Sequence, residues 1–247
     1  MYGLMVYDIG GRGQSEVSFG NTASIIESRT TGRIQPLHYG VNYNENPLEF
    51  TLVFGSMREM DRYELEEVSA WLTGHNNYRW LSIDQPDMDE MQFRCIVTKL
   101  TPIYHGWLPI AFEATIRCDC PYAYGYPFTE TYSIGNSASN IIFKNLSTVN
   151  DYVKPTLMFT PNGATSISIV NHSDNDREFK IENISDGSVV LADNLNGILT
   201  DTSTYERNLY SGFNLNFFRL VRGDNALTIT GKGVLKISGR FLYNAAG

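Results

Sequence analysis

A glycine-rich stretch near the start of the chain is the first segment whose residue types could do chemistry. It reads Gly10-Gly11-Arg12-Gly13-Gln14-Ser15. A phosphate-binding loop needs a Lys-Ser or Lys-Thr pair and a following helix, because an ammonium group, a hydroxyl and backbone amides share the phosphates. That pair is missing, and the alternating residues 16–19 predict a strand instead. We therefore expect a hairpin tip here and no nucleotide site.

Cysteine and histidine are common metal ligands, but their spacing here does not predict a metal site. Cys118 and Cys120 would share one face of a strand, while Cys95 lies elsewhere in the chain. A structural zinc site needs four ligands. No two histidines have i, i+4 helical spacing, and the four occur at His38, His75, His105 and His172. We expect the thiols to be buried as small apolar groups, and we expect no metal and no other cofactor.

Catalytic motifs are not recognisable in the sequence. It has no Gly-x-Ser-x-Gly elbow, and scattered positions do not define a Ser-His-Asp or Cys-His set. The acidic run 84–90 lacks the glycine and the ligand spacing of a calcium loop. A glycosidase would need two carboxylates across a cleft, whereas this run reads as a solvated loop. The sequence therefore predicts no catalytic residues and no enzyme, with a cytoplasmic hydrolase as the least favoured alternative.

Aromatic side chains on an exposed sheet would indicate sugar binding, because a sugar ring stacks on an aromatic face. The three tryptophans lie in the first half of the chain, at Trp71, Trp80 and Trp107. The second half has other aromatic candidates, each equally suited to a core: Tyr205, Tyr210, Phe213 and Tyr243. Carbohydrate binding by the second half therefore stays open as an alternative.

Alternation of apolar and polar residues predicts the strands of the first half. Apolar residues occupy every second position from 48 to 54, and again from 110 to 118. Compact apolar runs predict two more strands, at 79–83 and 93–98. Pro86 ends the first of these runs, since proline cannot donate to a ladder.

One helix is predicted within this half, over residues 60–73. Asp61 is suited to the N-cap, and Glu64 three residues later completes a capping box. Gly74 predicts a left-handed C-terminal stop. The residues expected to pack on the strands recur at helical spacing: Met60, Tyr63, Val68, Trp71 and Leu72.

The second half shows shorter strands and denser turns, which predict a β-sandwich without a helix. Two prolines and a glycine within 121–128 exclude a regular strand, so we place the connection between two domains there. The domains then span 1–128 and 129–247. Pro161-Asn162-Gly163 predicts a turn with glycine at positive φ. The expected strands are 156–160, 166–170, 178–181, 209–210, 217–221, 226–230 and 234–243.

Length and charge set further limits. The chain has 247 residues, of which 42% are hydrophobic, so two domains or one large all-β unit are expected. The net charge of −8 argues against specific nucleic-acid binding and against docking on anionic lipid. No apolar run is long enough to span a membrane, and the N-terminus lacks a signal-peptide pattern. Three cysteines do not form a disulfide framework, so we expect a soluble protein of a reducing compartment.

Several motifs occur in a characteristic order. They are Met1-Tyr2-Gly3, Pro47-Leu48-Glu49-Phe50-Thr51-Leu52-Val53-Phe54, Arg79-Trp80-Leu81-Ser82-Ile83-Asp84, Cys95-Ile96-Val97, 106–119, Pro121-Tyr122-Ala123-Tyr124 and 217–227. In this order they resemble the distal tail protein (Dit) family of long-tailed bacteriophages, most specifically between residues 47 and 124. Cys120 departs from the family, in which serine is more frequent, and this places nothing functional in doubt.

The resemblance implies a mainly β fold with two domains. The first would be a β-sandwich with one α-helix that assembles head-to-tail into a homo-hexameric ring. The second would be a galectin-like or carbohydrate-module-like β-sandwich outside the ring. With about 117 residues it leaves no room for an inserted module, so we expect a plain scaffold.

The resemblance also implies a place in the virion. The ring would join the tail tube protein to the tail-associated hub protein at the tail tip, and it would offer a mount for a receptor-binding protein. DNA would pass through its lumen, which we expect to be acidic so that the phosphates slide past. Assembly would take place in the host cytoplasm. The alternative is a carbohydrate-binding module protein that recognises host surface glycans.

Overall fold

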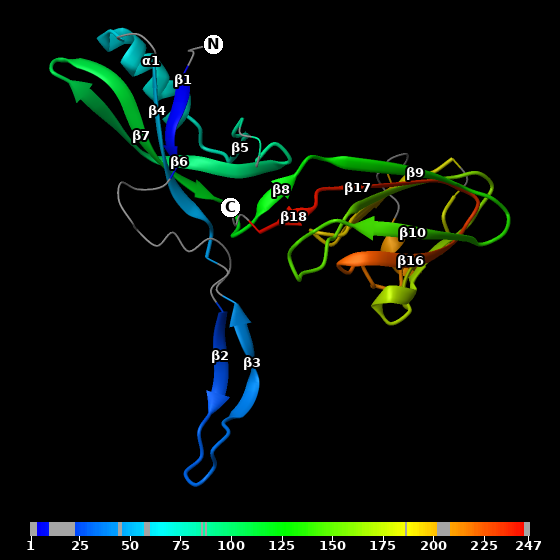
Figure 1. Cartoon of the computed structure of the whole chain (residues 1–247). Coiled ribbons are helices and arrows are strands. Elements are labelled where there is room, and N and C mark those ends of the chain that lie inside the picture. The colour runs from blue at the N-terminus through cyan, green and yellow to red at the C-terminus, as the bar shows by residue number, and fades with distance from the viewer. Residues whose placement is uncertain are drawn as a thin grey trace. The chain divides into compact units, whose positions relative to one another are not determined.

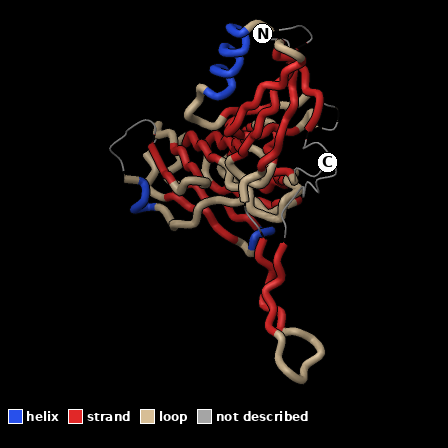
Figure 2. The backbone as a smooth tube through the Cα atoms, turned by 90° about the vertical axis from the view of Figure 1, so that its left-hand side faces the viewer, coloured by secondary structure: helices blue, strands red, loops and turns tan. Residues whose placement is uncertain are grey.

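The computed structural model describes residues 4–9, 23–43, 46–56, 60–84, 86, 88–185, 187–201 and 208–244. The chain forms two compact units, residues 1–124 with 244–247 and residues 125–243. Their division falls within the predicted connection 121–128. Figure 2 shows that both units are built mainly from strands. The glycine-rich stretch 10–15, the strand expected at 16–19 and the motif 1–3 lie outside the described residues.

The first unit contains an antiparallel sheet and a separate hairpin. The sheet has the order β1-β4-β7-β6, with β5 also paired to β6, and β2 pairs with β3 (Figure 1). The strands are β1 (Leu4–Ile9), β2 (Ala23–Ser28), β3 (Leu37–Tyr43), β4 (Glu49–Ser56), β5 (Arg79–Leu81), β6 (Met91–His105), β7 (Leu108–Cys118) and β8 (Ala123–Gly125).

The alternation predicted for β4 and β7 is confirmed. Leu52 pairs with Ala114 and Phe54 with Phe112, and all four side chains are buried. The Phe54 and Phe112 rings stack with their centroids 5.7 Å apart. Two neighbouring strands therefore bury the same face, which gives this sheet its core. β6 is much longer than the predicted 93–98, and β5 is shorter than the predicted 79–83.

Helix α1 (Arg62–Thr73) begins as predicted. The backbone amide of Glu64 donates to Asp61 Oδ1 at 2.8 Å, and the amide of Asp61 donates to Glu64 Oε2 at 3.2 Å. The prediction for Gly74 is wrong, because its φ of −74° is not left-handed. Glycine is needed there for space, since a Cβ would lie 2.4 Å from the carbonyl oxygen of Ala70.

The buried face of α1 is narrower than the sequence predicts. Met60, just before the helix, and Val68 are buried, and α1 packs against β6. Tyr63 is 80% exposed and Trp71 is 52% exposed, so their predicted packing on the strands is wrong. Helical periodicity identifies an apolar stripe but not how much of it the neighbouring sheet covers. No helix in the described part of the chain is long and apolar enough to cross a membrane.

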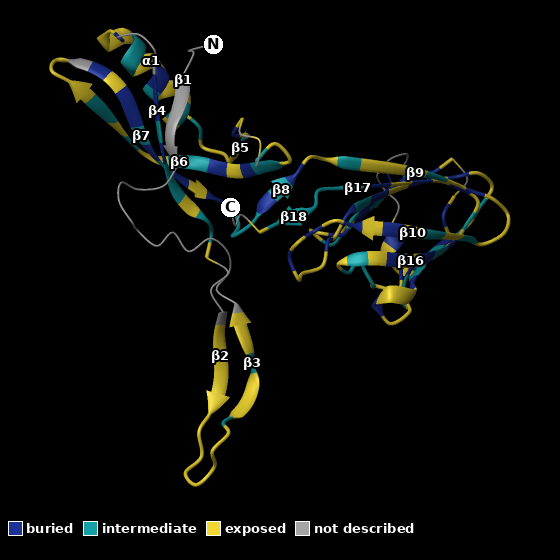
Figure 3. Cartoon of the chain, viewed as in Figure 1, coloured by how far each residue is buried: buried dark blue, intermediate teal, exposed yellow. Residues whose placement is uncertain are grey.

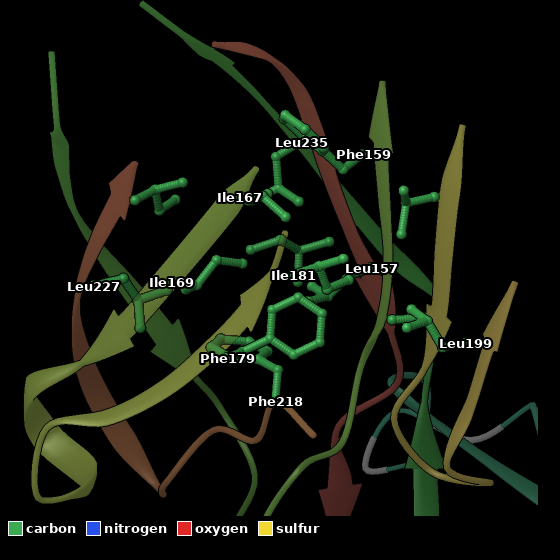
Figure 4. Packing of buried hydrophobic residues seen from close by; sticks show 14 of the residues in the cluster. Leu157, Phe159, Ile167, Ile169, Phe179, Ile181, Leu199, Phe218, Leu227 and Leu235 are labelled. Carbon is green, nitrogen blue, oxygen red and sulfur yellow. The ribbon is translucent and has the colours of Figure 1, made fainter. Parts of the chain in front are cut away.

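The second unit is a sandwich of two sheets with orders β10-β16-β12-β13 and β15-β14-β11-β17-β9. Its strands are β9 (Phe128–Ile134), β10 (Ser139–Asn145), β11 (Thr156–Pro161), β12 (Ile167–Asn171), β13 (Arg177–Ile181), β14 (Val190–Asp193), β15 (Ile198–Asp201), β16 (Gly223–Thr230), β17 (Gly233–Gly239) and β18 (Leu242–Tyr243). Leu157, Ile169, Phe179 and Leu235 belong to the core cluster shown in Figure 4. The predicted mainly β, two-domain fold is confirmed.

Several local predictions for this half are wrong. Residues 209–210 belong to the 3-10 helix η2 (Leu209–Gly212). Residues 217–221 form no strand, although Leu220 makes an isolated bridge with Val153. The expected strand 234–243 is interrupted between β17 and β18. Within the connection 121–128, β8 is a short strand where we excluded a regular one. In each case a few long-range contacts outweigh the local pattern.

Candidate interaction surfaces

The hairpin formed by β2 and β3, which we call the arm (residues 23–43), carries an uncovered apolar face. It is almost entirely exposed, as Figure 3 shows, and its strands pair with no other described strand. Ile25 lies opposite Val41, and Ile25 is 63% exposed. Ser24 lies opposite Asn42, and this pair faces the other side. Because a lone two-stranded hairpin is marginally stable in water, the apolar face indicates a partner surface.

The loop at the end of the arm is basic. Arg29 lies 3.5 Å from Glu27, whereas the Arg33 side chain has no partner among the described residues. Gly32 provides the turn with a φ of +89°, a conformation that favours glycine. Ile34, next to Arg33, is fully exposed. The arm therefore ends in a free guanidinium beside an apolar side chain.

The exposed face of α1 forms an aromatic and acidic stripe. Tyr63, Glu67 and Trp71 follow one another at i, i+4 spacing, so their side chains lie along one line of the helix. Glu66, beside the stripe, pairs with Arg62 at 3.0 Å. Glu67 has no ion pair within the described residues. The stripe thus places one carboxylate between two aromatic side chains.

A third exposed aromatic group lies at the tip of the β6–β7 hairpin. His105 pairs with Leu108, which leaves Gly106 and Trp107 as a two-residue turn. Gly106 has a φ of +64°, and glycine tolerates this conformation without strain. Trp107 is 96% exposed. Tip residues of such turns are ordinarily small and polar, so a tryptophan here is suited to a binding contact.

The second unit has a shallow hollow of about 450 Å³ on the sheet that contains β10 and β16. His172 lies at its edge, with Nε2 2.8 Å from Thr228 Oγ1 and Nδ1 2.6 Å from Asp176 Oδ1. The Thr228 hydroxyl donates to Asn140 Oδ1 at 2.8 Å. Ile142 also lines the hollow and is 74% exposed.

In this network a hydroxyl (Thr228), an imidazole (His172) and a carboxylate (Asp176) follow one another as in a catalytic triad, but the hydroxyl is hydrogen-bonded differently. A nucleophilic hydroxyl must pass its proton to the histidine, and the Thr228 proton is directed to Asn140 instead. The side chain of Asp176 is 76% exposed, so water solvates the carboxylate that would orient the ring. The arrangement therefore does not support a hydrolase.

Those aromatic residues considered for sugar binding that the structure describes do not form a platform. Phe213 is buried in the core, where its ring contacts those of Phe179 and Phe217. The Tyr210 hydroxyl accepts from the Leu199 amide at 2.9 Å and donates to the Gly197 carbonyl at 3.2 Å. Tyr243 is half-buried, and Tyr205 lies outside the described residues.

The three cysteines lie in or near the core of the first unit. Cys95 on β6 lies opposite Cys118 on β7 in the strand ladder, and both are buried free thiols. Cys120 is half-buried. Burial, with a smaller contribution from Asp119, raises the pKa of Cys95 to about 11. Burial also raises the pKa of Cys118 to about 12. Protonated thiols are poor nucleophiles and metal ligands, and the described residues contain no cluster that could hold a metal ion.

The arm is not among the elements predicted above. A protruding hairpin is predicted at the glycine-rich stretch 10–15 instead, which lies outside the described residues. A signal was present, because the apolar runs 23–26 and 37–41 flank Thr31-Gly32. Two adjacent isoleucines break the alternation, however, and they obscure which side is apolar.

Comparison with known proteins is consistent with these surfaces. A family model described as a phage tail protein N-terminal domain matches residues 1–120, and one described as a phage tail C-terminal domain matches residues 122–239. The chain belongs to the phage tail proteins. No curated protein sequence matches it significantly.

Solved structures show the same fold. The Dit protein of phage SPP1, described as a paradigm of the hub adsorption apparatus in phages infecting Gram-positive bacteria, has a TM-score of 0.67 at 12% identity. The match covers 96% of this chain and 93% of that one. Two structures of the activated baseplate of phage p2, with strontium and with calcium, give TM-scores of 0.54 and 0.52 at 10% and 9% identity, each match covering 96% of this chain and 90% of that chain. The resemblance to distal tail proteins is thus confirmed, and membership of a structural tail family agrees with a non-enzymatic role.

Proposed function

We propose that this tail protein forms a homo-hexameric ring at the tail tip, between the tail tube protein and the tail-associated hub protein. The first domain would build the ring, the second would lie outside it, and the two would meet within 121–128. The ring would scaffold the adsorption apparatus, including a receptor-binding protein, and assemble in the host cytoplasm. Family membership supports a tail role, and the arm supports the ring.

The arm is the observation that carries the proposal. Its apolar face, with Ile25 and Val41, is covered by no described part of the chain. A closed head-to-tail ring offers every copy an identical neighbour, so one type of contact covers the arm of each copy. Specific interfaces involve about 20–30 residues on each side, so one face of the arm, residues 23–43, would supply part of such an interface.

Charge supports the passage of DNA through the ring. Each chain carries a net charge of −8, and six copies multiply it. An acidic lumen would repel phosphates and keep the genome from binding tightly, because phosphate contacts dominate DNA affinity. A lumen mapped as neutral or basic would contradict this part of the proposal.

The second domain is proposed as a scaffold that does not bind sugar. The alternative, recognition of host glycans, would need an exposed aromatic surface, and Tyr210 and Phe213 are held by contacts within the unit. Binding of a glycan array or of host cell walls by the isolated fragment 129–247 would favour the alternative.

The location and the ring can be tested together. Virions labelled with gold-conjugated antibody against the chain should carry gold at the tail tip, and negatively stained purified protein should show annular particles with sixfold averages. Gold along the tail shaft or on the capsid would contradict the location. Particles of another symmetry would contradict the hexamer even if the label is at the tip.

A further inference from the structure

The arm and the exposed face of α1 have complementary chemistry. The arm ends in Arg33, a cation without a partner in the described part of the chain, beside the exposed Ile34. The stripe on α1 presents the carboxylate of Glu67, which has no ion pair among the described residues, between Tyr63 and Trp71. The arm is exposed in Figure 3, and Tyr63 and Trp71 are 80% and 52% exposed. We propose that the arm of one copy docks on α1 of the next copy, with Arg33 pairing with Glu67 between the two aromatic side chains. The inference rests on the proposed ring.

Arginine fits the stripe on α1 better than other side chains do. Its planar guanidinium forms charge-assisted hydrogen bonds with a carboxylate and also stacks on aromatic faces. A cation over a tyrosine or tryptophan face gains further attraction, more so when water is excluded. Tyr63 and Trp71 lie one helical step to either side of Glu67, so one guanidinium can contact all three.

The same docking would cover the apolar groups of both surfaces. Ile34 follows Arg33, and the exposed Ala70 precedes Trp71 on α1. Aromatic and arginine residues dominate binding energy when neighbouring contacts exclude water. A heterologous contact between two different patches of the same chain is the type that closes into a ring.

Reciprocal charge reversal tests the pairing. The midpoint concentration is the protein concentration at which half of the chains are assembled into rings. Arg33→Glu and Glu67→Arg should each raise it about tenfold or more, because close interfacial charge pairs couple strongly. The combined variant should return the midpoint to within about threefold of the native protein. The matched controls are Arg29→Glu and Glu66→Arg, whose native partners lie within their own chain. Native rings that resist all four single changes would overturn the pairing and leave the proposed ring intact.

Cross-linking tests the position directly. Cysteines introduced as Ile34→Cys and Ala70→Cys in one chain should be joined by a short bis-maleimide into a ladder that reaches six copies on a denaturing gel. Both changes are made in a Cys120→Ser background, because Cys120 is only half-buried. Either substitution alone should then give no ladder, since the native Cys95 and Cys118 are buried. A product of single-chain mass would show that the arm folds back on its own helix and would overturn the proposal. Native rings without a ladder would overturn it too, whereas a native chain without rings would contradict the proposed function.

Discussion

Replacing Ile25 by aspartate should weaken the ring while leaving the fold of each chain intact. Ile25 is 63% exposed and faces the same side as Val41. Full burial of an isoleucine contributes about 1.5–3 kcal/mol, so roughly 1–2 kcal/mol is left for a partner to gain. Placing a carboxylate in the apolar contact adds a desolvation penalty, which brings the expected loss to about 2 kcal/mol for each interface.

The ring repeats this loss at every interface. Six equal interfaces lose about 12 kcal/mol per ring. Five association steps build a hexamer, so each step loses about 2.4 kcal/mol, and the midpoint concentration should rise about fifty-fold because about 1.4 kcal/mol corresponds to a factor of ten. Mass photometry over a dilution series measures that midpoint. Thermal unfolding of the monomer checks that the fold is kept.

Two matched variants control for the added charge. Ser24→Asp places a carboxylate on the same strand but on the opposite face of the arm. Ile142→Asp places one at an isoleucine of similar exposure, 74%, in the second unit. Both should leave the midpoint within about threefold of the native value, since exposed charges contribute little. An unchanged midpoint for Ile25→Asp, or an equal shift in either control, would refute the role of the arm.

Three further predictions concern the two units separately. Asp174→Ala should lower the free energy of unfolding of the second unit by about 2–3 kcal/mol in calorimetry, because it leaves the partly buried guanidinium of Arg219 without its carboxylate. An unchanged stability would show that the Asp174–Arg219 ion pair is dispensable. The raised pKa values of Cys95 and Cys118 leave both thiols protonated below pH 9 in the folded chain, so their burial costs no stability there. The free energy of unfolding of the first unit should fall as the pH rises from 9 towards 11, because the thiols ionise more readily in the unfolded chain. Iodoacetamide should label both cysteines only on unfolding, and rapid labelling of the folded protein at neutral pH would contradict this. The fragment 125–243 should unfold at a higher temperature than 129–247, because the second fragment lacks Phe128, whose ring stacks on that of Phe241; equal melting would favour a boundary at 128.

Local signals in the sequence predict the regular elements well. The alternation at 48–54 and 110–118 marks β4 and β7, since a buried sheet face imposes period two. The capping box at Asp61 is equally local, because its two hydrogen bonds close within three residues. Gly163 adopts a φ of +74°, as its turn sequence predicts.

Predictions fail where neighbours distant in sequence decide the outcome. Leu220 is fully buried in the core cluster of the second unit and makes one isolated bridge with Val153, so its burial needs no regular strand. Tyr63 and Trp71 follow the helical period but lie beyond the area that the sheet covers. Periodicity gives the direction of a side chain, whereas burial depends on what is opposite it. The interaction surfaces are missed for the same reason, because the partners proposed for them lie outside the chain.

The ring itself is tested most directly by native mass spectrometry of the purified full-length chain. Our account predicts a dominant species with the mass of six chains, obtained from the chain alone or on addition of the tail tube and hub proteins. A chain that stays monomeric or dimeric at every concentration, with both partners present, would contradict the account.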